Sequence, residues 1–128
     1  MKIQESAENY LETVLVLSKR SGSVRAVDVA EELGFSKPSV SVAMKNLRNS
    51  GYVETDQYGG IVLTDAGRAI AEKIYERHTL LSGWLERLGV SPETAAEDAC
   101  RIEHVISEES FSALKAHAVG SGGCGQKD

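Results

Sequence analysis

Cys100, Glu103 and His104 are the residues of this chain whose types and spacing most clearly support chemistry. If residues 92–106 form a helix, side chains three and four positions apart lie on one face of it. A thiol, a carboxylate and an imidazole would then project together from one turn, and all three are ligands for transition metals. The spacing predicts a metal site. What a bound metal would regulate depends on the other elements of the chain.

The elements that must position this turn can be predicted from hydrophobic periodicity and from residues that begin or end helices. Gly34, Gly51 and Gly89 provide the usual stops at helix ends. Ser36 and Thr64 stand where N-caps are expected, which predicts where two of the helices begin. The expected helices cover residues 5–20, 26–33, 37–50, 65–88, 92–106 and 107–118.

Two short β-prone runs between the third and fourth helices predict a hairpin. Tyr52–Thr55 and Ile61–Thr64 flank a turn that contains Gly59 and Gly60. Two helices joined by a tight turn and followed directly by a hairpin are the order of elements in a winged helix-turn-helix. We therefore expect a mainly α fold with a small β-hairpin wing, in which a winged helix-turn-helix precedes a second, helical unit.

The second helix of this unit is expected to read DNA with its outer face. Helical winding of residues 37–50 gathers apolar side chains on one side and leaves short polar and basic ones on the other. Hydroxyl groups there can donate to phosphates or base edges, and basic groups can neutralise phosphates. Val42 is either a scattered surface valine or a contact to a thymine methyl. The predicted DNA contacts are Ser36, Lys37, Pro38, Ser39, Ser41, Val42, Lys45, Arg48 and, at the hairpin tip, Tyr58.

Composition limits the classes of function. The chain has 128 residues, a formal net charge of −5 and no apolar run long enough to span a membrane. Its first residues lack a secretory pattern and its two cysteines make no disulfide framework, so we expect a reduced, cytoplasmic protein with Cys124 as a tail thiol. Basic residues outnumber acidic ones over 19–48, and the reverse holds over 65–128, which favours DNA binding by the first segment.

Five segments of the chain resemble the diphtheria toxin repressor family of iron- and manganese-dependent regulators. They are NYLETVLVL, SVRAVDVAEELGFSKPSVSVAMKNLRNSGYV, YGGIVLTDAG, ERHTLLSGWLERLGV and EDACRIEHVIS, which occur in the order of that family. The resemblance implies a winged-helix DNA-binding domain at 1–64 and a helical dimerisation and metal-binding domain at 65–118, without the SH3-like domain of some members. It also implies a homodimer that binds a palindromic double-stranded operator and represses metal-uptake genes. Residues 119–128 have too little apolar content to fold and are expected to form a disordered tail.

The same resemblance implies the metal ligands, which are Asn9, Glu12, His78, Cys100, Glu103 and His104. Cys100 is similar to the iron-sensing members, whereas Glu12 with His78 resembles the manganese branch and Asn9 fits neither. Because a thiolate suits iron better than manganese, we favour Fe(II) as the activating metal and place Mn(II) second. Zn(II), Co(II) or Ni(II) could bind in vitro.

Three interpretations from other classes stay open at this point. A metal-independent winged-helix regulator could sense a small molecule or oxidation through Cys100, and metal dependence of DNA binding would separate it from a metal-gated one. An enzyme with Cys100 as nucleophile and His104 as base is disfavoured, because no third group or oxyanion loop is evident. A zinc-stapled structural protein would leave the polar face of residues 36–49 unused. We therefore expect no enzyme, no membrane partner and no small organic substrate.

Overall fold

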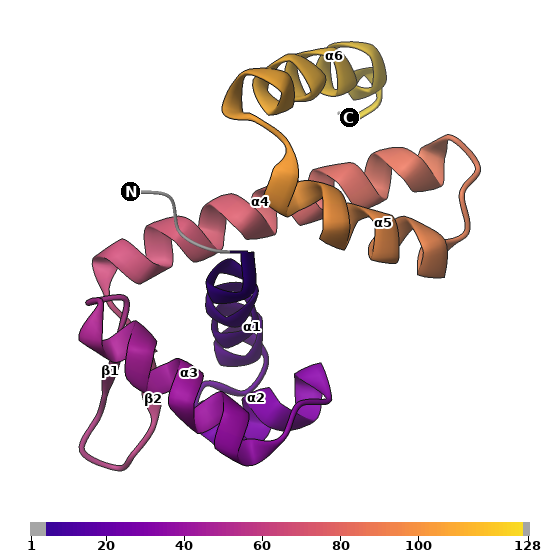
Figure 1. The fold of residues 1–128 in the computed structure, drawn as a ribbon. Helices are drawn as coiled ribbons and strands as arrows, with labels where there is room; N and C mark the ends of the chain where they lie inside the picture. Colours follow the sequence, from indigo (N-terminus) through magenta and orange to yellow (C-terminus); the bar gives the residue numbers. More distant parts are fainter. Residues whose placement is uncertain (1–4, 127–128) are drawn as a thin grey trace. The chain divides into compact units, whose positions relative to one another are not determined.

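The computed structural model describes the backbone of residues 5–126 and the side chains of residues 5–118. The chain divides into two compact units, Met1–Ile74 and Tyr75–Asp128, and the boundary between them falls inside the long helix α4, Asp65–Arg87. Helices dominate both units, as the periodicity predicts (Figure 1). Among the residues that the structure describes, no helix is both long and apolar enough to cross a membrane.

The first unit is a helix-turn-helix with a β-hairpin, as predicted. Before α4 its elements are α1 (Glu5–Ser21), α2 (Ala26–Leu33), α3 (Lys37–Asn49), β1 (Val53–Thr55) and β2 (Ile61–Leu63). The three helices pack against one another, β1 packs against α3, and β2 packs against α1. The strands are antiparallel with Glu54 opposite Val62, and Ile61 N also donates to Val24 O at 2.7 Å. These contacts attach the hairpin to the body of the unit.

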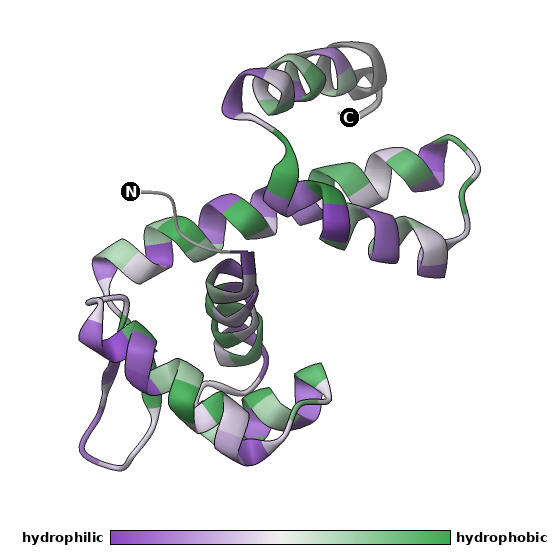
Figure 2. Cartoon of the chain, in the orientation of Figure 1, coloured by the Kyte–Doolittle hydropathy of each residue, from purple (hydrophilic) through white to green (hydrophobic). Residues whose placement is uncertain are grey.

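The apolar stripes of α1 and α3 meet in the core of this unit. Leu11, Val14 and Leu15 of α1 are fully buried, and Val40 of α3 lies in the same cluster as Val29 of α2. Burial of an aliphatic side chain stabilises a fold by about 1.5–3 kcal/mol, so these positions contribute strongly to stability. Both apolar and polar residues occur along α3, as Figure 2 shows by colour. α3 is therefore held through one face.

Local capping explains where α3 and α4 begin. Ser36 Oγ accepts a hydrogen bond from Ser39 N at 3.3 Å, and Pro38 lies in the first turn, where a helix does not need its N–H. Thr64 Oγ1 accepts from Gly67 N at 3.1 Å at the start of α4. The predicted N-cap roles of Ser36 and Thr64 are confirmed. Strand β2 ends one residue before its predicted limit because Thr64 serves as this cap.

The second unit consists of the rest of α4 with α5 (Pro92–Val105) and α6 (Glu108–Gln126). Ser91 and Ser107 cap α5 and α6, since the hydroxyl of each accepts from the N–H three residues later, at 3.4 Å and 3.0 Å. Among the described side chains of this unit, the buried apolar ones are Leu81, Ala95, Ala99, Phe111 and Ala118. Small alanines on α5 allow close packing, which places the polar residues of the same helix in a buried setting.

α6 continues to Gln126 and so exceeds its predicted end at Ala118. The structure gives residues 119–126 a helical backbone, and the disordered tail expected at 119–128 stays a prediction. Residues 127–128 and the side chain of Cys124 lie outside the described part of the chain.

Candidate metal centre and nucleic-acid interface

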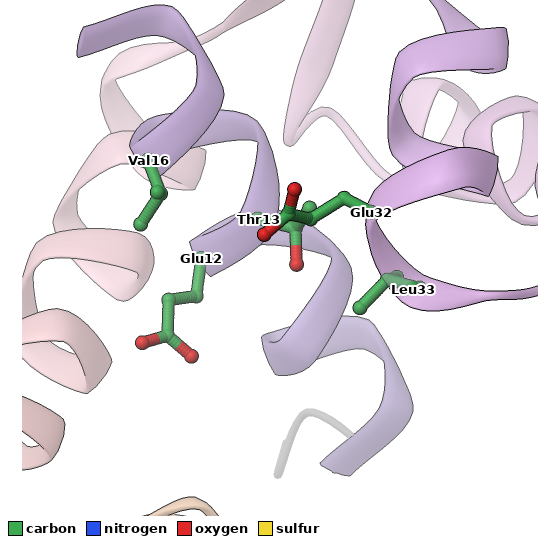
Figure 3. A pocket seen from close by; sticks show the side chains of 5 residues that line it. All are labelled: Glu12, Thr13, Val16, Glu32 and Leu33. Carbon is green, nitrogen blue, oxygen red and sulfur yellow. The ribbon is translucent and has the colours of Figure 1, made fainter. Parts of the chain in front are cut away.

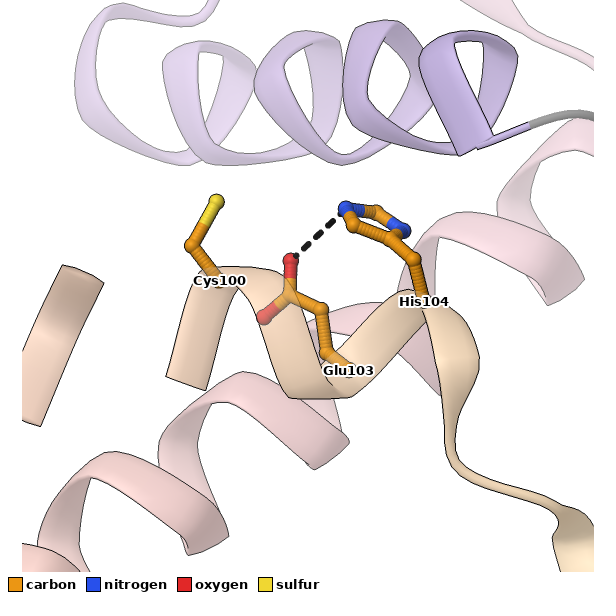
Figure 4. Close-up of side chains that lie close together, drawn as sticks. All are labelled: Cys100, Glu103 and His104. Atoms are coloured by element: carbon orange, nitrogen blue, oxygen red, sulfur yellow. Dashed lines mark ion pairs between the residues drawn. The ribbon is translucent and has the colours of Figure 1, made fainter. Parts of the chain in front are cut away.

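The last turns of α5 bring together the three residues whose spacing first suggested a metal. The ligand atoms of Cys100, Glu103 and His104 all lie within 4.8 Å of one another. Figure 4 shows the three side chains projecting from the same face of α5, as residues three and four positions apart must. The helical prediction is confirmed at this turn, whereas metal binding by these residues stays a prediction.

Glu103 is the most deeply placed of these groups. Its side chain is fully buried, and its Oε1 lies 2.8 Å from Nδ1 of His78 on α4. Its Oε2 lies 3.3 Å from Nε2 of His104, an ion-pair distance. Among the described residues, however, no donor makes a hydrogen bond of good geometry to Glu103 Oε2. A buried carboxylate with an unsatisfied oxygen is costly unless a cation compensates it, so this atom is where a positive ion fits.

The donor set also fits a transition metal on chemical grounds. Cys100 offers a soft sulfur, Glu103 a hard oxygen, and His104 and His78 imidazole nitrogens of intermediate softness. His78 already contacts the central carboxylate, so it either joins the ligands directly or orients Glu103 as a partner of the ligand. The arrangement within this unit is therefore compatible with the divalent metal implied by the sequence.

Asn9 and Glu12, the two remaining predicted ligands, belong to the first unit. They lie about one helical turn apart on α1, and Glu12 is buried. Glu12 also lines a pocket of about 170 Å³ between α1 and α2, whose other walls are Thr13, Val16, Glu32 and Leu33 (Figure 3). This volume is below the roughly 300–1,000 Å³ typical of organic ligand sites. The pocket therefore gives no support to a small-molecule sensor.

The outer face of α3 presents the predicted DNA-contacting residues to solvent. All of them are exposed: Ser36, Lys37, Pro38, Ser39, Ser41, Val42, Lys45, Arg48 and, in the hairpin, Tyr58. Val42 is 60% exposed at the middle of the helix, and Tyr58 is 72% exposed at the turn between the strands. The inward residues Val40 and Met44 are buried, so one helix separates core contacts from a polar surface. This is the arrangement that a recognition helix requires.

The tip of the hairpin is fixed by one carboxylate and one guanidinium. Asp56 Oδ1 accepts from Tyr58 N and from Gly60 N, each at 2.8 Å, and Arg25 Nη2 donates to Tyr58 O at 2.6 Å. The hydrogen bonds from Gly60 and Tyr58, together with the positive charge of Arg25, lower the pKa of Asp56 below its ordinary value. Gly59 has φ of +82°, a backbone conformation that favours glycine. The wing therefore presents Tyr58 in a defined position.

Two residues that hold these sites were missed by sequence reasoning. Arg77 is buried on α4 and donates to the carbonyl oxygen of Glu103 at 3.1 Å. The sequence could have indicated that Arg77 is buried and has partners. It lies three residues after Ile74 and four before Leu81, on the helix face that carries these two buried residues, and a buried charge requires partners. Arg25 had no comparable signal, since an exposed arginine before a helix usually has no special partner.

Family models match nearly the whole chain. Residues 2–61 match the N-terminal DNA-binding domain of the iron-dependent repressors, and residues 64–118 match the metal-binding and dimerisation domain of the same family. The chain belongs to the iron-dependent repressor family. The winged-helix fold and the resemblance inferred from the sequence are thereby confirmed. Iron-dependent repressors are metal-dependent DNA-binding transcriptional regulators and not enzymes, which confirms the expected class of function.

Individual relatives agree with the family. The transcriptional regulator MntR of Escherichia coli O6:H1 is 38% identical over 112 residues, which cover 88% of this chain and 72% of that protein. The solved structure of the manganese regulator SloR aligns with a TM-score of 0.77 at 28% identity, covering 91% of this chain and 54% of its own. IdeR of T. acidophilum aligns with a TM-score of 0.78 at 25% identity, covering 94% and 55%. This iron-dependent repressor chain thus spans about half the length of those two structures.

Proposed function

We propose that this iron-dependent repressor chain is a metal-activated repressor that binds DNA through α3 and the hairpin. The observation that carries the proposal is the buried Glu103 carboxylate, whose Oε2 lacks a hydrogen bond among the described residues and lies beside the ligand atoms of Cys100 and His104. A site of this kind attracts a divalent cation. DNA binding is what such a cation would regulate, and the exposed polar face of α3, in the unit matched to the DNA-binding domain, is the surface proposed for it.

The proposed ligands come from both units of the chain. Cys100, Glu103 and His104, together with His78, are supported by their mutual distances within the second unit. Asn9 and Glu12 are supported by the family resemblance, so substitution is the test of their role. A bound divalent ion would neutralise carboxylate and thiolate charge that otherwise opposes closure of the site.

We propose Fe(II) as the activating metal, with Mn(II) second. The sulfur of Cys100 supports iron, since manganese prefers carboxylate and water ligands. The names of the relatives support manganese, because SloR is a manganese regulator and another solved relative is a manganese-dependent repressor in complex with manganese. Zn(II), Co(II) and Ni(II) suit the same donors and serve as probes in vitro.

The proposed target is a palindromic operator in double-stranded DNA, bound by a homodimer in the cytoplasm. The match to a dimerisation domain over residues 64–118 supports the homodimer, and two-fold symmetry of the protein would be mirrored in the operator. We assign DNA binding to residues 1–64, and dimerisation and metal binding to residues 65–118. The half-sites should lie about 34–36 Å apart, which is one turn of DNA, or a multiple of this spacing.

The proposal is tested first by anaerobic calorimetry of Fe(II) and Mn(II) binding to chelator-treated protein. Binding of DNA from upstream of the protein's own gene is measured next. Wild-type protein should bind at least one of the two ions and should bind DNA more tightly when metal is present. Cys100→Ala should lose most of the Fe(II) response and keep its fold. Cys100→Glu, which replaces sulfur by a hard oxygen donor, should bind Mn(II) better than Fe(II).

The controls for this experiment distinguish the site from its surroundings. Cys124→Ala removes the other cysteine and should bind metal as the wild type does. DNA binding that is unchanged by metal and by chelator would contradict the proposal. It would favour a metal-independent regulator, and the response of Cys100 to peroxide would then be the next measurement.

A further inference from the structure

Glu103 is held at its backbone and at its side chain by two consecutive residues of α4. Arg77 Nη1 donates to the carbonyl oxygen of Glu103 at 3.1 Å, while His78 Nδ1 lies 2.8 Å from Glu103 Oε1. Packing alone positions most side chains in a helix. The Glu103 carboxylate is positioned in addition by the hydrogen bond from Arg77 to the backbone carbonyl of the same residue. Its position relative to α4 is therefore closely defined.

Arg77 makes its contacts at the C-terminal end of α5. The same Nη1 donates to Ile106 O at 3.0 Å, just after the last residue of the helix. The final carbonyl groups of an α-helix lack partners within the helix and carry the negative end of its dipole. Arg77, a residue only 6% exposed, satisfies two carbonyls there with its guanidinium. Arg77 thereby fixes the turn of α5 that carries Glu103 and His104.

The other side of the guanidinium faces α6. Arg77 Nη2 donates to Glu108 Oε1 at 3.0 Å, and its central carbon lies 5.3 Å from the centroid of the Phe111 ring. Both residues lie in the first part of α6, and Phe111 is buried. The side chain of Arg77 therefore joins the end of α5 to the start of α6. Helix α6 itself carries none of the proposed ligands.

We propose that Arg77 is a positioning residue of the metal centre and that α6 influences metal affinity through it. This inference rests on the proposed metal-binding function. Groups that orient metal ligands without touching the metal commonly change its affinity about 10–100-fold when they are replaced. Glu108 and Phe111 hold the guanidinium in place, so replacing them should weaken metal binding although neither residue is a ligand.

Co(II) titration under anaerobic conditions tests this inference, because the absorption spectrum of Co(II) reports its ligands and their geometry. Arg77→Met should lower Co(II) affinity about 10-fold or more and change the spectrum. Arg77→Lys keeps the charge but loses the planar fork, so it should restore part of the affinity. Glu108→Gln and Phe111→Leu should weaken binding in the same direction by smaller factors.

A second charge pair between α4 and α6 provides the matched control. Lys115 of α6 pairs with Glu76 of α4, the residue next to Arg77. Lys115→Met therefore removes an α4–α6 contact without touching the carbonyls of Glu103 and Ile106. It should bind Co(II) with the affinity and spectrum of the wild type.

Hydrogen exchange of the metal-free protein gives a readout that does not depend on metal. The amide of Ile106, which donates to Ile102 O at 3.0 Å, should exchange faster in Glu108→Gln and Phe111→Leu than in the wild type or in Lys115→Met. If the wild type binds Co(II) and these two variants match it in affinity, spectrum and exchange, the role of Arg77 is refuted while the proposed function stands. If the wild type binds no Co(II), Fe(II) or Mn(II), the proposed function fails and the inference fails with it.

Discussion

Asp56 illustrates how a single exposed residue can order the turn of a hairpin. Its carboxylate accepts two backbone N–H groups of the hairpin turn, and Arg25 donates to the carbonyl between them. A Cβ on Gly60 would lie 2.8 Å from Asp56 Oδ2, so a side chain there would displace this carboxylate. The negative charge of Asp56 thus orders the segment that presents Tyr58.

The lowered pKa of Asp56 predicts how the hairpin responds to acid. A carboxyl group whose pKa is lower in the folded state contributes stability above its unfolded pKa, near 3.8, and loses it as pH falls through the folded value. Asp56→Asn should therefore be less stable than the wild type in urea at pH 7, and the difference should shrink as the pH falls below about 4. A difference that stays constant down to pH 2.5 would show that the charge of Asp56 is not involved.

At the scale of elements, the start of α4 is held by several hydrogen bonds and by one close backbone approach. Thr64 N donates to Tyr52 O at 3.1 Å, and Thr64 Oγ1 donates to Gly51 O at 2.7 Å. A Cβ placed on Gly67 would lie 2.0 Å from Tyr52 O, which is a backbone atom. Only glycine permits the first turn of α4 to approach the chain this closely.

Two glycines of α4 should consequently respond in opposite ways to alanine. Gly67→Ala should destabilise the protein by about 1–3 kcal/mol or more, because the methyl group forces a backbone shift. At Gly83 the nearest atom to a new Cβ is Arg87 Nη1, 3.7 Å away, so Gly83→Ala should stabilise the helix by about 0.5–1 kcal/mol. Urea unfolding at one protein concentration measures both, and similar changes in the two variants would contradict the assignment.

The elements themselves could be predicted from the sequence because their signals are local. Ser36 and Thr64 act on N–H groups three residues away, and the Cys100–Glu103–His104 turn follows from helical spacing alone. The contacts that hold the sites could not be predicted in this way. The bond from Arg77 to Glu103 joins residues 26 positions apart, and that from Arg25 to Tyr58 joins residues 33 apart. Neither spacing follows any helical or strand period, so only the folded chain reveals the partner.

At the scale of the whole molecule, the two family domains of one chain should be thermodynamically linked. If metal raises the affinity for operator DNA by some factor, operator DNA must raise the affinity for metal by the same factor. We expect a factor of about 5–150, the usual range for coupled sites. Fe(II) or Mn(II) titrations with and without operator, compared with DNA titrations with and without metal, measure both ratios. Unequal ratios would indicate a change of oligomeric state or a second metal site.

The outer face of α3 has a consequence for how such a repressor changes over evolutionary time. Lys37, Ser41, Val42 and Lys45 are all exposed, whereas the buried residues of the helix are Val40, Met44 and Leu47. Substitution of exposed residues usually changes stability by less than about 0.5 kcal/mol. If α3 reads the operator as proposed, lineages can drift to a new operator sequence one substitution at a time without passing through an unfolded intermediate. The same property makes this face a suitable place for libraries that select new DNA sites.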